Sequence, residues 1–125
     1  MNKKILIVDD DLYIRELYEE VFKDAGFDVS ASFDGEEGLK KMQQGGYDII
    51  LLDVMMPKLD GIGVLTKLQT TPPLVKNGPI LLLTNLAHET VIQDAIKKGA
   101  AGFLIKTDVT PDVLTAKVKE YLLKA

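Results

Sequence analysis

Six polar residues of this 125-residue chain stand at the ends of short apolar stretches: Asp9, Asp10, Asp11, Asp53, Thr84 and Lys106. If the stretches are parallel strands, these residues gather at one edge of a sheet. Crowded carboxylates repel one another and raise one another's pKa values. A divalent cation resolves that conflict, and a ligand set of oxygens suits Mg²⁺, which one or two carboxylates usually hold. The spacing therefore predicts a magnesium site.

Each of these residues also has a purely structural interpretation. One of Asp10 and Asp11 suits the N-cap of a following helix, and Asp53 alone would be an ordinary turn residue. Lys106 alone would be a surface lysine, and Thr84 is an unremarkable strand residue. The functional hypothesis depends on their occurring together, each at the end of a different strand.

The stretches that precede these residues are the expected strands. Four of them are short and apolar throughout, as in a parallel sheet that is covered on both faces: Ile5–Val8, Ile49–Leu52, Ile80–Leu83 and Phe103–Ile105. In a fifth stretch, Val29, Ala31 and Phe33 alternate with polar neighbours. This alternation predicts a strand at an edge of the sheet.

Helical patterns lie between the strands. Apolar residues recur at spacings of three and four over 14–22, 91–96 and 114–122. A shorter helix is expected from Asp60–Gly61 to about Gln69. Start signals precede two helices: Asp34 with Glu37 as a capping box, and Thr110 as an N-cap followed by Pro111.

The strict alternation of strands and helices predicts a doubly wound α/β sandwich, because parallel strands need helical crossovers. Five strands fit the order 2-1-3-4-5, in which ligands bind beyond the carboxyl ends of strands one and three. The length fits one domain, residues 1–125.

Composition restricts the function further. The net charge of −4 and the dispersed lysines argue against nucleic acid as the main partner. No apolar run approaches the roughly 18 residues that span a bilayer, and no signal peptide precedes Asp9. We therefore expect a cytoplasmic protein without a membrane partner. Cysteine is absent, which excludes disulfides and thiol chemistry.

Four sequence blocks, in order and at matching spacing over essentially the whole chain, resemble the signature blocks of bacterial response-regulator receiver domains of two-component systems. They are Ile5–Asp10 (ILIVDD), Leu51–Pro57 (LLDVMMP) with Asp60–Gly61, Leu83–Thr84, and Gly102–Lys106 (GFLIK). The resemblance implies the flavodoxin-like fold of the chemotaxis regulators.

The resemblance also implies roles for the residues at the sheet edge. Asp53 would accept a phosphoryl group from a phosphohistidine on a sensor histidine kinase or histidine phosphotransfer protein. Asp9, Asp10 and Asp53, with the backbone carbonyl of Met55, would bind Mg²⁺. Thr84 would hydrogen-bond the phosphoryl group and Lys106 would pair with it.

The output that the resemblance implies is a conformational switch. Phe103, three residues before Lys106, would change rotamer when Thr84 moves. The change would repack the face formed by the fourth helix, fifth strand and fifth helix, for a downstream protein target that the sequence does not identify. Such a domain is a regulatory phosphoacceptor, with self-modification and autodephosphorylation at Asp53 only, and we expect a monomer or weak homodimer.

Several residues depart from the family pattern. Thr107 replaces the usual proline after Lys106, so we expect a trans bond between them and a rearranged loop, because a cis bond before a non-proline residue costs about 2.5–4 kcal/mol. Asn85 replaces a small residue. Gly38 replaces alanine, at a cost of roughly 1 kcal/mol in an exposed helix interior. The single histidine, His88, is expected to face solvent near a helix start.

Three other functions compete with the phosphorylation switch. A pseudo-receiver would use this fold for protein interaction without phosphorylation. An aspartyl-phosphate phosphatase would need a second acid two residues after Asp53, where Met55 stands. A flavin carrier would need a phosphate-cradling loop after the first strand, where acids stand instead. Met55 and Met56 are expected to be packing and loop residues rather than a sulfur site.

Overall fold

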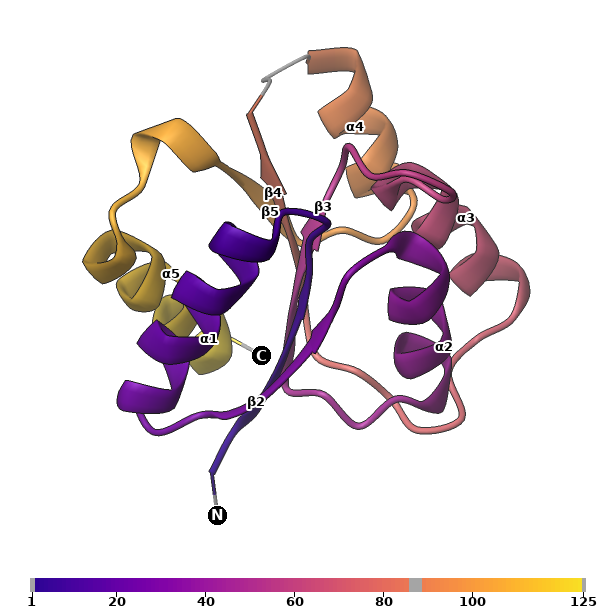
Figure 1. Cartoon of the computed structure of the whole chain (residues 1–125). Coiled ribbons are helices and arrows are strands. Elements are labelled where there is room, and N and C mark those ends of the chain that lie inside the picture. The colour runs from indigo at the N-terminus through magenta and orange to yellow at the C-terminus, as the bar shows by residue number, and fades with distance from the viewer. Residues whose placement is uncertain (1, 86–88, 125) are drawn as a thin grey trace.

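Five parallel strands form the centre of the protein, which is described here by a computed structural model (Figure 1). The structure describes residues 2–85 and 89–124. The strands are β1 (Lys4–Val8), β2 (Asp28–Ser32), β3 (Ile49–Asp53), β4 (Ile80–Thr84) and β5 (Gly102–Ile105). The helices are α1 (Leu12–Asp24), α2 (Gly35–Gln44), α3 (Gly61–Thr70), α4 (Glu89–Lys97) and α5 (Pro111–Lys124), with a 3₁₀ turn at Lys106–Asp108.

The strand order is β2-β1-β3-β4-β5, with every neighbouring pair parallel, as the sequence predicted. In register, Val8 pairs with Leu52, and Asp53 pairs with Leu83. The first, third and fourth strands therefore end at the same level, which brings the residues at their carboxyl ends together.

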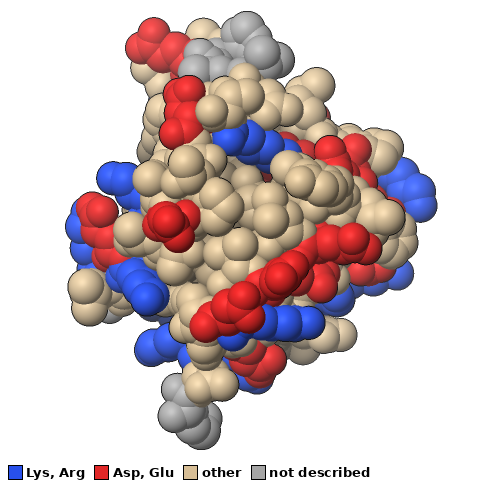
Figure 2. Space-filling view, turned by 60° about the vertical axis from the view of Figure 1, so that its left-hand side comes forward, with Lys and Arg blue, Asp and Glu red and all other residues tan. Residues whose placement is uncertain are grey.

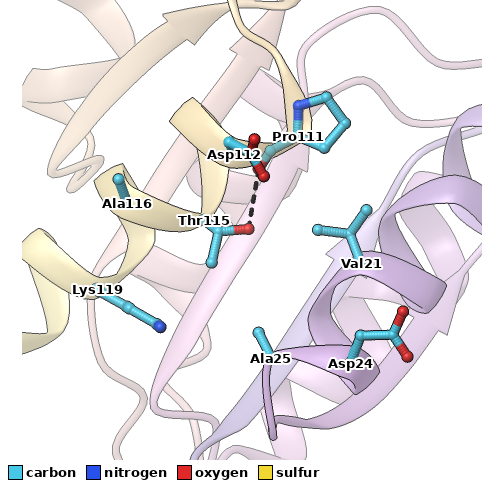
Figure 3. Close-up of a pocket in the computed structure, with 8 residues that line it drawn as sticks. All are labelled: Val21, Asp24, Ala25, Pro111, Asp112, Thr115, Ala116 and Lys119. Carbon is cyan, nitrogen blue, oxygen red and sulfur yellow. Dashed lines mark hydrogen bonds between the residues drawn. The ribbon is translucent and has the colours of Figure 1, made fainter.

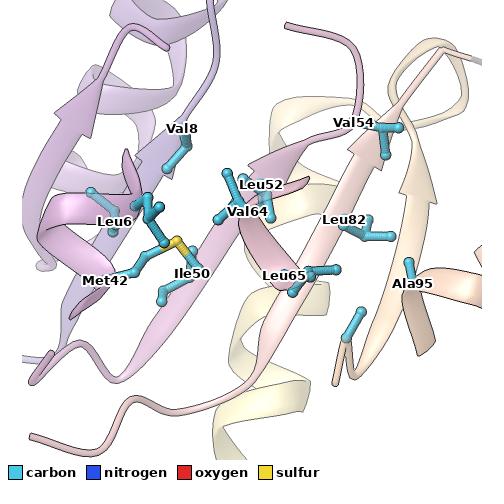
Figure 4. Packing of buried hydrophobic residues seen from close by; sticks show 12 residues of the cluster. Leu6, Val8, Met42, Ile50, Leu52, Val54, Val64, Leu65, Leu82 and Ala95 are labelled. Atoms are coloured by element: carbon cyan, nitrogen blue, oxygen red, sulfur yellow. The ribbon is translucent and has the colours of Figure 1, made fainter. Parts of the chain in front are cut away.

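The sheet separates two hydrophobic clusters, because successive strand residues point to opposite faces. Leu6, Val8, Ile50, Leu52 and Leu82 face α2, α3 and α4, where they pack with other residues of that cluster (Figure 4). On the opposite face, α1 and α5 cover the second cluster (Figure 1), which contains Ile5, Ile7, Ile49, Leu51, Leu81 and Leu83. The double-sided burial explains why these strands are apolar throughout.

The edge strand β2 begins and ends one residue earlier than expected. It ends at Ser32, and Phe33 lies outside it with 52% of its surface exposed. Val29 packs against the cluster on the α1 and α5 side. The alternation thus predicted an edge strand correctly, but not its last residue.

Helix-capping residues lie where the sequence placed them. Asp11 caps α1 by accepting the Ile14 N–H at 3.2 Å, which confirms the structural interpretation of Asp11. Asp34 Oδ1 accepts the Glu37 N–H at 2.9 Å at the start of α2. Thr110 Oγ1 likewise accepts the Val113 N–H at 3.2 Å, immediately before Pro111, the first residue of α5. These caps fix where each helix leaves the sheet edge.

The expectation that Gly38 lies in an exposed helix interior was wrong. Gly38 is buried on the face of α2 that meets β1. A Cβ atom there would lie 2.6 Å from Cγ1 of Val8, a stiff, fully buried side chain. Glycine therefore allows α2 to approach the sheet closely, which offsets its low helix propensity.

Candidate functional site

The carboxyl edge of the sheet gathers the chemically competent side chains. Asp9 follows β1, Asp53 ends β3, Thr84 ends β4 and Lys106 follows β5. Asp9, Asp53 and Thr84 are at most 5% exposed, whereas Asp10 is exposed. Burying two carboxylates is costly unless they are paired or bind a cation, so this placement itself indicates a function.

Lys106 forms the centre of the site. Its Nζ lies 2.7 Å from Oδ2 of Asp9 and 3.2 Å from Oδ2 of Asp53, and its side chain is 9% exposed. The amine thus neutralises two buried acids at once. Lys106 lies between β5, which ends at Ile105, and the rest of the 3₁₀ turn, of which it is the first residue.

No peptide bond between described residues is cis, which confirms the expected trans bond between Lys106 and Thr107. The segment after the lysine is a 3₁₀ turn, Lys106–Asp108, that leads to the Thr110 cap of α5. A threonine in place of proline is therefore compatible with a lysine amine that reaches Asp53.

Three carboxylates form a candidate metal site. Asp9, Asp10 and Asp53 each offer an oxygen, and these oxygens lie within 4.8 Å of one another. Among residues 2–85 and 89–124 the cluster consists of carboxylates alone, so the ligand chemistry fits a hard cation such as Mg²⁺. The backbone N–H of Met55 donates a hydrogen bond to the Asp53 carboxylate, which places Met55 beside this cluster.

The electrostatics of the site oppose ionisation of Asp53. Burial and the neighbouring Asp9 raise the pKa of Asp53 to about 6, although Lys106 and the Met55 N–H act in the opposite direction. Burial opposes the charge on Lys106 as well, but its hydrogen bond to Asp9 and the charges of both acids raise the pKa of Lys106. A bound cation would favour the ionised form of Asp53 that a nucleophile needs.

We expect the metal-free protein to lose stability as the pH rises from 4 to 6. An aspartate in an unfolded chain has a pKa of about 3.9, so in this interval folded Asp53 binds protons that the unfolded chain has released. Asp53→Asn should flatten this slope and raise the free energy of unfolding at pH 7 by about 1–2 kcal/mol after solvent screening. Urea denaturation with chelator present measures both. Equal slopes in the variant and the wild type would contradict the prediction.

Two residues near the site were not singled out by the sequence. Arg15 donates from Nη1 to the backbone carbonyl of Asp9 at 2.8 Å, and the Asp11 N–H donates to Oδ1 of Asp9 at 3.0 Å. Lys58, in the loop after Asp53, pairs with Asp34. The residue types gave no signal for Arg15, because its partner is a backbone carbonyl.

The residues expected to take part in switching lie near this edge. Phe103 is 39% exposed on β5, and Thr84 pairs in register with Ile105 of the same strand. Asn85 is exposed. His88 lies outside the described residues.

The two methionines after Asp53 differ in their surroundings. Met55 is 66% exposed, whereas Met56 packs against the cluster on the α2 and α3 side. The packing interpretation therefore holds for Met56, and Met55 is a loop residue beside the site.

A cavity in the described part of the chain lies away from these groups. It measures about 510 Å³ between α1 and α5 and is lined by Val21, Asp24, Ala25, Pro111, Asp112, Thr115, Ala116 and Lys119 (Figure 3). Thr115 Oγ1 donates to the Pro111 carbonyl, so this hydroxyl is engaged within α5. The cavity therefore gathers no set of groups comparable to the Asp53 site.

The surface on this side of the molecule is acidic in part. Acidic side chains form a band across the face that includes α1 (Figure 2).

Comparison with known proteins gives a consistent result. A sequence model described as "Response regulator receiver domain" matches residues 5–119. Over 125 residues the chain is 39% identical to the alkaline phosphatase synthesis transcriptional regulatory protein PhoP of Bacillus subtilis, covering all of this chain and 50% of that protein. It is 34% identical to the chemotaxis protein CheY of Listeria monocytogenes, covering 93% of this chain and 96% of CheY.

A solved structure extends the likeness to three dimensions. The CheY-like response regulator receiver domain protein of Methanospirillum hungatei JF-1 superimposes with a TM-score of 0.88 at 27% identity, covering 99% of this chain and 96% of that one. The chain spans about half the length of PhoP but nearly the whole of CheY. In residues 2–85 and 89–124, no helix has the length and apolar character needed to cross a membrane.

Proposed function

Since the chain belongs to the response regulator receiver domain family, we propose that residues 1–125 form a single phosphorylation-driven switch domain with Asp53 as its phosphoacceptor. Receiver domains of this family are regulatory phosphoacceptors rather than conventional enzymes. One observation carries the proposal: the Lys106 amine lies between the buried carboxylates of Asp9 and Asp53, beside a third acid, Asp10. This arrangement has a nucleophile, a fixed positive charge and a set of metal ligands.

The proposed donor is a phosphohistidine on a sensor histidine kinase or histidine phosphotransfer protein. An Asp53 carboxylate oxygen attacks phosphorus while the phosphorus–nitrogen bond breaks. The bonding electrons remain on the imidazole nitrogen, and Asp53 becomes an acyl phosphate. Phosphoryl transfer needs positioning and charge neutralisation more than covalent machinery. Hydrolysis of the acyl phosphate, with water attacking phosphorus and Asp53 leaving, resets the domain.

Residues of the chain have separate parts in this reaction. Asp9, Asp10, Asp53 and the Met55 carbonyl would hold Mg²⁺, which supplies charge neutralisation at the phosphoryl oxygens when bound. The Lys106 amine, already 3.2 Å from Asp53, would pair with the phosphoryl group. Thr84, whose strand end lies beside that of Asp53, would donate a hydrogen bond from its hydroxyl to the same group.

The proposed output is a change in the α4-β5-α5 face. Phosphorylation adds about one negative charge and new acceptor oxygens at Asp53, which favours an inward position of Thr84. Phe103, 39% exposed on β5, would then change rotamer. A charge event at Asp53 thereby biases a surface that an unidentified protein target recognises.

The proposed partners are proteins. The net charge of −4 and the acidic band across the α1 face favour a protein partner over nucleic acid (Figure 2). We propose a cytoplasmic location, as the phosphodonor requires, and a monomer or weak homodimer. The alternative is a pseudo-receiver that binds partners without phosphorylation.

The direct test is Mg²⁺-dependent phosphoryl incorporation from a small-molecule phosphodonor, measured by intact-mass spectrometry. The switch domain predicts incorporation of one phosphoryl group, and the pseudo-receiver predicts none.

We expect Asp10→Ala to weaken Mg²⁺ binding about tenfold, because it removes one of three clustered carboxylates. Titration of the wild type with Mg²⁺ should shift amide resonances near residues 9–11 and 53–55. Asp11→Asn is the matched control, since asparagine retains the N-cap of α1 and Asp11 is not a member of the cluster. Unchanged affinity in Asp10→Ala would place the metal site elsewhere.

A further inference from the structure

The loop between β3 and α3, residues 54–60, is in contact with the start of α2. Lys58 Nζ lies 3.5 Å from Oδ2 of Asp34, the N-cap of α2, whose side chain is 6% exposed. Next to it, Gly35 has no room for a Cβ because the Leu59 carbonyl occupies that position. The first turn of α2 therefore packs directly on the loop that follows Asp53.

Lys58 has an unfavourable backbone conformation. Its φ is +67°, and among the described residues no other non-glycine residue has a positive φ. For an L-residue this left-handed region is strained, because it brings Cβ too close to the following carbonyl oxygen. Such a conformation persists where surrounding contacts over-determine it. Here the Leu59 N–H donates to the Pro57 carbonyl at 2.8 Å across Lys58, and the close approach of Gly35 to Leu59 and the ion pair to Asp34 hold this turn against α2.

The other end of the loop is held by α3. The Gly61 N–H donates to the Val54 carbonyl at 2.9 Å, and Asp60 caps α3 by accepting the Gly63 N–H at 2.7 Å. Met55 lies between these two attachments and donates its N–H to the Asp53 carboxylate. Both ends of this short loop are therefore held, with Met55 between them.

We propose that Lys58 and Asp34 are positioning residues for the Asp53 site, with the ion pair from α2 holding the loop so that Met55 keeps its amide on Asp53 and its carbonyl available to a cation. The cation part of this inference rests on the proposed function. The Glu37 N–H, and to a smaller extent Lys58, hold the pKa of Asp34 below its ordinary value, so the carboxylate is charged at neutral pH. The Lys58 side chain is 59% exposed, so breaking the ion pair should change the Mg²⁺ affinity by only a modest factor.

The sign of the Lys58 effect separates positioning from simple electrostatics. A lysine near a cation site repels the cation, so its removal should strengthen Mg²⁺ binding if charge alone matters. If Lys58 positions the loop, its removal should weaken Mg²⁺ binding instead. Asp34→Asn weakens binding under either hypothesis, so the lysine variants decide between them.

The experiment measures Mg²⁺ affinity of the full chain, without phosphodonor, from amide shifts. Lys58→Asn removes the ammonium while retaining a residue that tolerates positive φ, and Asp34→Asn retains the cap. We expect each variant to weaken Mg²⁺ binding roughly two- to fivefold, and the double variant to bind Mg²⁺ no more weakly than either single variant. Lys58→Arg, which keeps the positive charge, should bind Mg²⁺ with wild-type affinity. Lys98→Asn, which breaks the Lys98–Asp94 pair on α4, is the control and should leave the affinity unchanged.

Unchanged or tighter Mg²⁺ binding in Lys58→Asn would overturn the proposal. A second readout needs no metal: the Met55 amide resonance of the metal-free protein should shift in Lys58→Asn and return in Lys58→Arg. If the wild type bound no Mg²⁺ near residues 9–11 and 53–55, the proposed function would fail while this readout still tested the positioning of Met55. No shift of that resonance would overturn the positioning role itself.

Discussion

Asp53→Asn is expected to take up no phosphoryl group from acetyl phosphate, whereas the wild type takes up one in the presence of Mg²⁺. An amide cannot supply the anionic oxygen that attacks phosphorus, and its oxygen is a weaker ligand for Mg²⁺ than a carboxylate. The variant should remain folded, because asparagine removes the buried negative charge that desolvation and Asp9 disfavour at this position. Intact-mass spectrometry after incubation, with and without a chelator, measures the incorporation.

Asp60→Asn is the matched control for this experiment. Asp60 caps α3 only seven residues further along, and asparagine preserves the cap, so labelling should remain at the wild-type level. Equal labelling of Asp53→Asn and the wild type would show that the phosphoacceptor lies elsewhere. A wild type that stays folded and binds Mg²⁺ but is never labelled would favour the pseudo-receiver alternative.

The strands and their order could be predicted because burial on both faces leaves a strong pattern. Ile49–Leu52 is apolar at every position, and β3 lies at the centre of the sheet. Once the strands are parallel and alternate with helices, topology alone brings Asp9, Asp53 and Lys106 to one edge. No knowledge of side-chain conformation was needed for that step.

Features that depend on loop conformation and close packing could not be predicted from the sequence. The positive φ of Lys58 occurs in a turn that the Leu59 N–H and the Pro57 carbonyl close and that packs on α2, more than twenty residues away in sequence, and lysine gives no local indication of it. The cost of Gly38 was inferred from helix propensity, whereas the lack of room for a Cβ beside Val8 is what favours glycine at this position. Arg15 reaches a backbone carbonyl, a partner that residue types do not reveal. In each case a tertiary contact overrides a local preference.

Lys106→Met is expected to lower the free energy of unfolding of the metal-free protein by about 3 kcal/mol at pH 7. The Lys106 side chain is 9% exposed and its ammonium contacts Asp9 and Asp53, whose side chains are 2% and 6% exposed. A methionine of similar length removes the positive charge, so the two adjacent buried carboxylates lose their neutralising partner. Lys98→Met, which breaks the partly exposed pair between Lys98 and Asp94 at the end of α4, should change stability by less than about 0.5 kcal/mol.

Mg²⁺ should reverse much of the Lys106→Met loss, because a cation among Asp9, Asp10 and Asp53 replaces the missing positive charge. A ligand that binds only the folded state adds RT ln(1 + [Mg²⁺]/Kd) to stability, and the variant should bind Mg²⁺ more tightly once the competing amine is gone. The loss should also shrink at pH 5, where Asp53, with a pKa of about 6 even beside Lys106, takes up a proton. Urea denaturation with Mg²⁺ or chelator, at pH 5 and pH 7, measures all three effects. A loss that neither Mg²⁺ nor acid reduces would mean that Lys106 stabilises the fold by packing, and its amine would not be the charge partner of Asp53.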